Sequence, residues 1–559
     1  MLSTALLLQA AAAAAAPPFA EEGARALPGV TTTCGESTAE KPTIIEVNGG
    51  GVLLADLDVD GDQDLFLVDG STLGRVRTGK PGEPPQVHLN RGDATFAPGG
   101  AGWAVAPGRW GMGGAVGDAD GDGRPDVAIT QWGPNRFLRN TGSGFTENAE
   151  ASGLTGSRWS TSAAFLDYDQ DGALDLAVIN YLAFRLEEID PMAGTCKWKG
   201  VPVMCGPEGL LPVHDILYRG KGDGTFEDVT AAAHFRPREA AYGLGVTTLD
   251  YDVDGDTDLY VANDSTPNHL WQNQGYGTFE EVGIKVGVAL DPNGKEQAGM
   301  GIGVGDVNGD GRQDLFVTNF SGENNTLYLS SGRTFRDASD TSRLGGHSIP
   351  MLGWGTGLYD FDLDRDLDIH VFNGHVYPEA DLPGMDTSYA QPAFLYRNAG
   401  KGVFAPELLS DAAPSVSRAS AVADLDGDGW LDIVAIQLDG PVRVLRNRGA
   451  EDLPKDVKRH WLEVRLVGRG KNRAALGASV AVELEGFRQV AEIRTAGGFQ
   501  AAVPPIAHFG LGDAAEVKRV VVRFPSGREV VRENVAADAL LVIEEPEPET
   551  QPASGEGDR

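Results

Sequence analysis

The stretch Asp56-Leu57-Asp58-Val59-Asp60-Gly61-Asp62-Gln63-Asp64 predicts a calcium-binding loop. Oxygen-bearing side chains stand at positions 1, 3, 5 and 9, and this alternation in a tight loop can direct several carboxylates at one hard cation. Glycine at position 6 permits the left-handed backbone that returns the ninth residue to the cation. The apolar residues 65–68 that follow are typical of a short strand, and no Glu stands at position 12, where an EF-hand needs one. The pattern therefore indicates a loop between two strands.

The same pattern recurs along the chain, giving seven loops in all, each followed by a short apolar run. A catalytic carboxylate pair is needed only once, so this repetition favours metal ligation over acid–base catalysis. We expect up to seven calcium ions. The predicted ligands are Asp56, Asp58, Asp60 and Asp64; Asp118, Asp120, Asp122 and Asp126; Asp167, Asp169, Asp171 and Asp175; Asp250, Asp252, Asp254 and Asp258; Asp306, Asn308, Asp310 and Asp314; Asp360, Asp362, Asp364 and Asp368; and Asp424, Asp426, Asp428 and Asp432.

A second repeated element follows each loop, a strand and a Gly-containing turn that lead to an aromatic residue, as in residues 89–96. Such an element predicts a hairpin. Loop and hairpin together make one four-stranded blade, and sheets that cannot each bury both faces stack radially. We therefore predict an all-β fold, a seven-bladed β-propeller over residues 43–452. The seventh copy stops before its aromatic residue, and we expect residues 43–47 to supply the missing strand.

An insertion at residues 181–213 interrupts the repeats and contains Cys196 and Cys205. Two cysteines in a loop-rich, exported segment favour a local disulfide; the alternatives are two free thiols or half of a metal site.

Different patterns flank the propeller. Residues 1–26 are expected to be a signal peptide or leader, although the apolar run 1–16 could also be a short Ala-rich helix at the terminus. Residues 27–42, with the lone Cys34, are expected to be flexible. Alternating apolar and polar residues predict a small β domain, a sandwich, over 458–545. The acidic, Pro-rich tail 546–559 is expected to be disordered.

The net charge of −35 argues against nucleic-acid binding, which needs basic patches. No apolar run long enough to span a membrane follows the first 16 residues. We find no catalytic motif and no nucleotide-cofactor motif, and the histidines do not have zinc-ligand spacing.

The repeats resemble FG-GAP/VCBS repeats, the calcium-loop blades of integrin-α-type propellers. The C-terminal residues 476–480, 508–512 and 520–527 resemble the ASPIC/UnbV domain of the cartilage acidic protein-like family. This resemblance covers about residues 45–545. It implies an exported calcium-binding interaction protein without an established reaction.

The sixth loop departs from the pattern because Arg365 stands where the other loops have Gly. A non-Gly residue in the left-handed region costs roughly 1 kcal/mol, and a cation beside the site adds repulsion. We expect the Asp360 loop to be the weakest calcium site.

Three functions remain open at this stage. The first is a secreted, periplasmic or cell-surface module that binds an extracellular protein or glycan. The second is a carbohydrate-active enzyme with its site on one propeller face and the Trp198 segment as a lid. The third is an architectural role in a surface assembly. A cleft that gathers Arg, Tyr and His with perturbed carboxylates would favour the enzyme.

Overall fold

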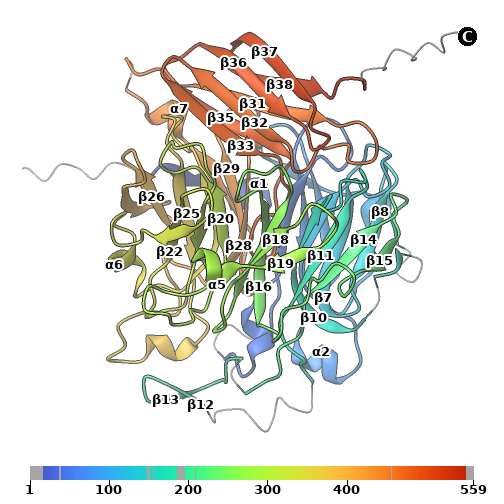
Figure 1. Ribbon diagram of the computed structural model, residues 1–559. Coiled ribbons are helices and arrows are strands. Elements are labelled where there is room, and N and C mark those ends of the chain that lie inside the picture. The colour runs from blue at the N-terminus through green and yellow to red at the C-terminus, as the bar shows by residue number, and fades with distance from the viewer. Residues whose placement is uncertain are drawn as a thin grey trace, which may run out of the picture.

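The computed structural model describes residues 17–36, 40–147, 152–154, 156–185, 196–207, 209–454 and 456–548. These residues form strands and turns with only short helical segments, so the chain is all-β, as predicted. Figure 1 shows a large body of sheets, with a second group of strands from the C-terminal residues 460–544 lying across one end of it. The predicted leader run 1–16 and most of the predicted tail lie outside the described residues.

Within the described residues the large body contains seven four-stranded antiparallel units, of which the second and third are joined into one sheet where residues 132–133 pair with residues 158–159. In chain order they are β2 (Gly51–Ala55), β3 (Asp64–Val68), β4 (Gln86–Asn90) and β5 (Phe96–Pro98); β6 (Trp110–Gly117), β7 (Asp126–Gly133), β8 (Arg136–Asn140) and β9 (Phe145–Glu147); β10 (Arg158–Leu166), β11 (Asp175–Asn180), β14 (Ile216–Gly220) and β15 (Phe226–Asp228); β16 (Gly243–Leu249), β17 (Asp258–Asn263), β18 (His269–Asn273) and β19 (Phe279–Glu281); β20 (Ile302–Gly305), β21 (Asp314–Val317), β22 (Thr326–Ser330) and β23 (Phe335–Asp337); β24 (Gly353–Tyr359), β25 (Asp368–Asn373), β26 (Phe394–Asn398) and β27 (Phe404–Leu408); and β28 (Ser417–Ala423), β29 (Asp432–Gln437), β30 (Arg443–Asn447) and β1 (Phe19–Glu21).

The first strands of the units form a closed ring, because each contacts the first strand of the next unit and β28 contacts β2. Small residues allow this close approach around the axis. A Cβ atom on Gly51 of β2 would lie 2.7 Å from the Cα atom of Gly113 of β6, too close for a side chain. Each Asp loop connects the first strand of a unit to the second, so all seven loops lie on one face of the propeller, called here the loop face.

The strand that completes the last unit is β1, and the prediction that residues 43–47 supply it is wrong. Phe19 of β1 pairs with Asn447 of β30, in antiparallel register. Residues 44–47 instead form the 3-10 helix η1 (Ile44–Val47), which is buried on every side. Their apolar character reflects this burial and not a place in a sheet.

The boundary expected at residue 26 and the flexible segment expected over 27–42 also need correction. The described part of this segment packs against the last unit, where the Val442 amide donates to the Val30 carbonyl at 3.1 Å. Cys34 is 2% exposed. Lys41 is buried as well, and its Nζ donates to the Cys34 carbonyl at 2.5 Å and forms an ion pair with Asp439. Burial raises the pKa of the Cys34 thiol to about 12, so this cysteine stays protonated.

The C-terminal domain is a sandwich of two sheets, one in the order β35-β31-β38 and one in the order β33-β32-β36-β37. Its strands are β31 (His460–Val467), β32 (Ser479–Leu484), β33 (Phe487–Glu492), β34 (Ala501–Ala502), β35 (Ile506–Gly512), β36 (Glu516–Arg523), β37 (Glu529–Ala536) and β38 (Ala539–Glu544). Strand β34 belongs to neither sheet, because it pairs in parallel with β2 of the propeller.

Short elements fill the connections. The insertion carries the hairpin β12 (Cys196–Trp198) and β13 (Val201–Val203). The helical segments are α1 (Gly23–Ala26), α2 (Leu73–Arg77), η2 (Ala101–Trp103), α5 (Gly283–Val286), α6 (Gly345–Ser348), η4 (Pro378–Asp381) and α7 (Gly449–Asp452). No helix among the described residues has the length and apolarity needed to cross a membrane.

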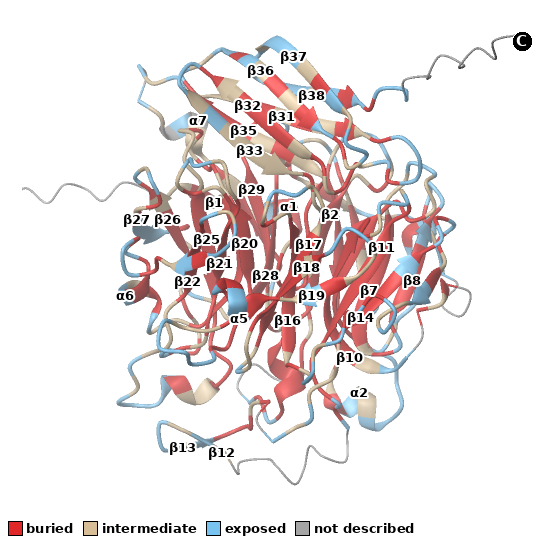
Figure 2. Cartoon of the chain, in the orientation of Figure 1, coloured by how far each residue is buried: buried red, intermediate tan, exposed pale blue. Residues whose placement is uncertain are grey.

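Buried residues follow the strands around the propeller axis, and the exposed ones lie in the outer turns (Figure 2). One apolar cluster runs through the ring from Met204 of the insertion, past Met112 and Trp354, to Phe499 of the C-terminal domain. The axis is therefore packed with side chains.

Candidate metal centres and the interface above them

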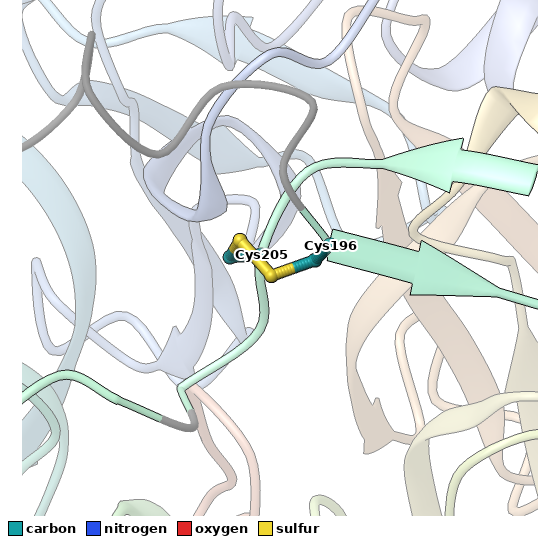
Figure 3. Close-up of a disulfide and its surroundings, with 2 residues drawn as sticks. All are labelled: Cys196 and Cys205. Atoms are coloured by element: carbon teal, nitrogen blue, oxygen red, sulfur yellow. A yellow bond between two sulfur atoms is a disulfide. The ribbon is translucent and has the colours of Figure 1, made fainter.

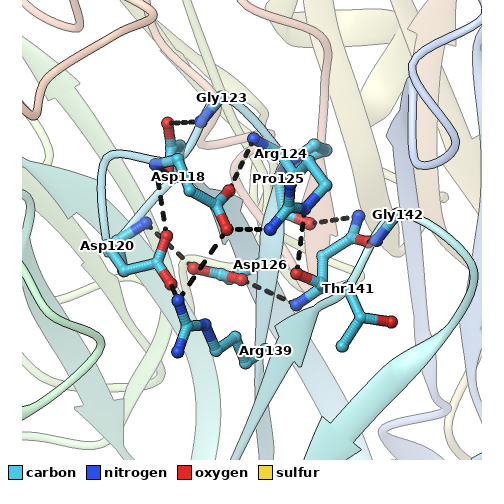
Figure 4. A network of polar contacts seen from close by, with 12 residues as sticks. Asp118, Asp120, Gly123, Arg124, Pro125, Asp126, Arg139, Thr141 and Gly142 are labelled. Atoms are coloured by element: carbon cyan, nitrogen blue, oxygen red, sulfur yellow. Dashed lines mark hydrogen bonds and ion pairs between the residues drawn. The ribbon is translucent and has the colours of Figure 1, made fainter.

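Each Asp loop is shaped by hydrogen bonds from its own backbone to its first aspartate. In the first loop the amides of Asp60 and Gly61 donate to the two carboxylate oxygens of Asp56, at 2.9 and 3.1 Å. The second loop repeats this arrangement around Asp118, which Figure 4 shows. This wrapping requires positive φ at position 6, and φ is +108° at Gly61. The sequence pattern thus produces a turn that faces its acidic side chains toward one point.

The ninth aspartate of the loop is buried and holds the loop to the sheet. Asp64 is 1% exposed and accepts hydrogen bonds from the amides of Leu57, at 2.9 Å, and Asn90, at 2.8 Å. Burial raises the pKa of Asp64 to about 7 and those of Asp126 and Asp314 to about 8, although hydrogen bonds from neighbouring amides oppose the shift.

The loop geometry fits a bound cation. In at least five loops, three carboxylates place oxygen atoms within 4.8 Å of one another. These groups are Asp56, Asp58 and Asp64; Asp118, Asp120 and Asp122; Asp167, Asp169 and Asp175; Asp250, Asp252 and Asp254; and Asp360, Asp362 and Asp364. Among the described residues, the aspartate at position 3 carries a buried oxygen without a hydrogen-bond partner in four loops, at Asp58, Asp252, Asp362 and Asp426, and in the second loop the corresponding Asp120 oxygen is buried against the Arg139 guanidinium. A buried carboxylate oxygen without a donor is costly, and a divalent cation would satisfy it.

Arginines approach three of the loops from the third strand of the unit. Arg139 forms an ion pair with Asp120 (Figure 4), and Arg219 pairs with Asp169 at 2.8 Å. In the sixth loop Arg397 Nη1 lies 3.2 Å from Asp362 and 2.9 Å from Asp368.

The sixth loop differs from the expectation in one respect. Arg365 adopts φ +88°, as its position 6 requires. Its guanidinium, however, lies over the Phe487 ring at 5.5 Å and 3.8 Å from Asp513, both in the C-terminal domain. Arg365 is thus paired across the domain interface, and Arg397 is the cation that contacts the ligand set.

An asparagine that recurs at the end of the third strand connects neighbouring units. Asn140 Nδ2 donates at 2.7 Å to the carbonyl of Leu57, in the loop of the preceding unit. Asn90 closes the ring in the same way, donating at 2.9 Å to the carbonyl of Leu425 in the last loop. Asn273, Asn398 and Asn447 make equivalent bonds. Asn recurs at this position in five of the seven units, whereas the third and fifth units have Gly220 and Ser330 there. This recurrence was the available signal, but the partners of these asparagines are far away in sequence.

The C-terminal domain lies on the loop face and bonds directly to the loops. The Gly512 amide donates to the Leu363 carbonyl at 2.9 Å, and Arg459 Nε donates to the Asp362 carbonyl at 3.0 Å. His508 Nε2 lies 2.9 Å from the Gly429 carbonyl of the seventh loop. These bonds connect the sixth and seventh loops directly to the docked domain.

Residues 495–503, called here the axial loop, descend from this domain into the ring. The Val52 amide of β2 donates to the Gln500 carbonyl at 3.1 Å, and the Val246 amide of β16 donates to the Gly498 carbonyl at 3.0 Å. The Phe499 ring packs on Trp354 of β24 at 5.0 Å. Because these partners come from three separate units, the axial loop occupies the propeller axis.

A cavity of about 310 Å³ remains between the two domains. Its lining includes Tyr359, Glu463, Glu492, Arg465 and Arg494. Burial raises the pKa values of Glu463 and Glu492 to about 7.

The insertion lies at the opposite end of the propeller (Figure 1). Cys196 and Cys205 form the disulfide expected from the sequence, with a Cα–Cα distance of 5.1 Å (Figure 3). Trp198 of the hairpin packs against His375 and Tyr377, with ring centroids 4.6 and 5.6 Å apart. Residues 186–195 and 208 of the insertion lie outside the described residues.

The family-model comparisons agree with this architecture. The FG-GAP-like repeat model matches residues 56–129, 118–178, 250–317 and 306–371. The ASPIC and UnbV model matches residues 468–550.

Curated and solved proteins give further similarities. Cartilage acidic protein 1 of Mus musculus is 29% identical over 354 residues, covering 61% of this chain and 50% of that protein. The Homo sapiens protein is equally similar, with 49% of it covered, so the chain spans about half the length of the curated relatives it matches.

Solved structures with a similar shape include an Agrocybe aegerita lectin that recognises non-reducing terminal N-acetylglucosamine. It has a TM-score of 0.39 and 16% identity, over 71% of this chain and 94% of the lectin. BBS1N in complex with ARL6DN has a TM-score of 0.41 and 10% identity, over 79% and 99%. On the sequence evidence, the chain contains FG-GAP-like repeats and an ASPIC and UnbV domain, and it is similar to cartilage acidic protein 1 over 61% of its length.

Proposed function

We propose that this chain is an exported, calcium-stabilised propeller that binds an extracellular protein or glycan. The observation that carries the calcium assignment is the set of buried position-3 carboxylate oxygens without donors, at Asp58, Asp252, Asp362 and Asp426. Several carboxylates so close together repel one another, and a divalent cation at each loop removes this repulsion. Calcium is thus a component of the folded state.

The placement of the C-terminal domain supports binding through the other face. That domain covers the loop face and sends the axial loop into the ring, so the loop face serves contacts within the chain. The opposite face carries the connections between second and third strands and the disulfide-bonded insertion. Loops displayed by a rigid scaffold are the usual location of binding residues.

The disulfide supports an exported location, periplasmic, cell-surface or secreted, because such bonds persist in oxidising compartments. Calcium supports the same conclusion, since the ion is abundant enough there to fill sites of modest affinity.

A screen of the full chain on protein and glycan arrays, with calcium and with a chelator, tests this function. We expect binding to a defined ligand class in calcium and its loss in chelator. Absence of any ligand in calcium would contradict a binding role. Binding that survives chelation, in protein shown by circular dichroism to remain folded, would remove calcium from the function.

The interdomain cavity favours a second candidate, a carbohydrate-active enzyme. It gathers Tyr359 and two arginines with Glu463 and Glu492, whose pKa values are raised to about 7 by burial. This cavity lies on the loop face, whereas the Trp198 segment that was expected to act as a lid lies at the other end. Hydrolysis of a glycan panel that disappears in Glu463→Gln would establish the enzyme; the absence of hydrolysis by the wild-type chain would exclude it for that panel.

A further inference from the structure

A pocket of about 560 Å³ lies on the face opposite the Asp loops, between the second and third propeller units. It lies where β7 ends and β10 begins, beside the first residues of the insertion. Arg109, Arg158 and Arg185 contribute positive charge to its lining, and Trp132, Trp159 and Phe184 contribute aromatic surface. Pockets of this size hold small ligands in many proteins.

The aromatic wall is held rigidly. Trp132 Nε1 donates to the Phe184 carbonyl at 3.2 Å, which fixes the Trp132 ring while leaving it half-buried at the pocket. The Phe184 ring contacts both tryptophans edge-to-face, at centroid distances of 5.5 and 5.2 Å. Trp159 is completely buried, yet its Nε1 has no hydrogen-bond partner among the described residues. The Trp159 indole is enclosed by protein atoms, so it supports the wall of the pocket from behind.

The arginines are available to a ligand. Arg158 is anchored, because its Nη1 donates to the His214 carbonyl at 3.0 Å. The guanidinium groups of Arg109 and Arg185 are exposed and have no ion-pair partner in the described part of the chain. Three arginines around one pocket, in a chain of net charge −35, form a local site for an anion.

We propose that this pocket binds a carboxylate-bearing sugar, one uronate unit of an acidic glycan. The proposal rests on the function given above and specifies its ligand. The apolar face of the sugar ring would stack on Trp132, as sugars and other flat apolar groups do on indole. The carboxylate would take charge-assisted hydrogen bonds from both Arg109 and Arg185.

The shape of the site favours a sugar over an acidic peptide. The pocket is compact and has a fixed aromatic wall on one side, whereas an extended peptide needs a groove or a free sheet edge. A carboxylate on a ring brings the charge and the stacking surface together within one unit.

Titration calorimetry of the full chain in calcium tests the proposal, with trigalacturonate as the probe and its methyl ester as the uncharged control. We expect the acid to bind and the ester to bind at least tenfold more weakly. Arg109→Gln and Arg185→Gln should each weaken binding of the acid about tenfold, since a charge-assisted hydrogen bond contributes about that factor. The matched control is Arg336→Gln, an exposed arginine on β23 in another unit, which should leave binding unchanged.

Three results would overturn the proposal: no binding of trigalacturonate, equal binding of acid and ester, or full competition by a short poly-Glu peptide. Trp132→Leu removes the stacking surface but no charge. It should therefore weaken binding of both the acid and the ester. If the array finds a ligand but trigalacturonate does not bind, the binding function stands and this assignment fails. If neither binds, both fail.

Discussion

Asp58 and Asp62 belong to the same loop but have different surroundings. Asp58, at position 3, has a buried oxygen without a donor, while Asp62, at position 7, lies beside Gly92 of the neighbouring hairpin. Only the first of these side chains belongs to the group whose oxygens lie within 4.8 Å of one another. Substitutions at these two residues therefore distinguish the effect of losing a metal ligand from the effect of losing a nearby negative charge.

Asp58→Asn should weaken calcium binding at this loop about tenfold, because the amide keeps an oxygen but loses the formal charge. Asp62→Asn removes the same charge from the same loop and should leave the affinity nearly unchanged. Titration calorimetry with calcium distinguishes the two variants. The Asp58→Asn protein should show one site of weakened affinity beside the unchanged sites of the other loops. Equal losses in both variants would show that bulk charge, and not the position-3 oxygen, determines affinity.

At the scale of elements, the repeated asparagine joins five of the seven units to the preceding one. Asn90 holds the ring closed, since its Nδ2 donates at 2.9 Å to the Leu425 carbonyl and at 3.2 Å to the Gln63 carbonyl. Asn90 is 6% exposed, so water does not readily replace these bonds.

Asn90→Ala should therefore lower the free energy of unfolding by about 3 kcal/mol, because two buried carbonyls lose their donor. Chemical denaturation in calcium measures the change. Arg91→Ala, at an exposed position one residue further along, is the control and should have an effect within about 0.5 kcal/mol. If both variants unfold alike, the asparagine does not hold the ring.

Local patterns in the sequence were sufficient to predict the loops and hairpins. Carboxylates at alternate positions and a glycine at position 6 act within nine residues, so the turn and its ligands could be predicted. The closing strand could not, because residues 19–21 carry no strand signal of their own and obtain their pairing from residues 445–447. The apolar residues 44–47 misled the prediction because burial and strand formation select similar side chains.

The arginine–tryptophan pocket was not expected either, since Arg109, Trp132, Arg158 and Arg185 share no motif.

At the scale of the whole molecule, the axial loop connects the C-terminal domain to several units at once. Gly498 has φ +82°, and a Cβ atom there would lie 2.6 Å from the Ile302 carbonyl oxygen. Gly486 has a similar φ of +72° but open space around it.

Gly498→Ala should displace the axial loop and loosen the domain, while Gly486→Ala carries the same backbone penalty without the clash. Limited proteolysis is the measurement, and cleavage between residues 452 and 460 should accelerate only in Gly498→Ala. Equal protection in both variants would mean that the axial loop is not needed for docking.

The aspartates predict how the stability of calcium-depleted protein depends on pH. Burial raises the folded-state pKa of Asp64 to about 7 and those of Asp126 and Asp314 to about 8, from an ordinary value of 3.8. The folded state then holds more protons than the unfolded state between about pH 4 and pH 8. This contribution to stability is complete below pH 4 and is lost as the pH rises toward 8.

Calcium-depleted protein should therefore melt at a lower temperature at pH 8 than at pH 5. With saturating calcium the trend should reverse, because the cation binds the deprotonated carboxylates. Scanning calorimetry of dialysed samples measures both. A melting temperature that falls toward pH 8 equally with and without calcium would contradict calcium binding at these loops.

The pairing of residues 19–21 with residues 445–447 makes completion of the propeller an all-or-nothing event. A chain that stops short of β30 would leave β1 without a partner and present an open sheet edge, the kind of surface that recruits other chains. Nearly the whole propeller must be synthesised before its two ends can meet, and closing so long a loop is slow. The arrangement thus allows only chains that extend through β30 to complete the last unit, so shorter products leave the edge of β29 exposed to proteases.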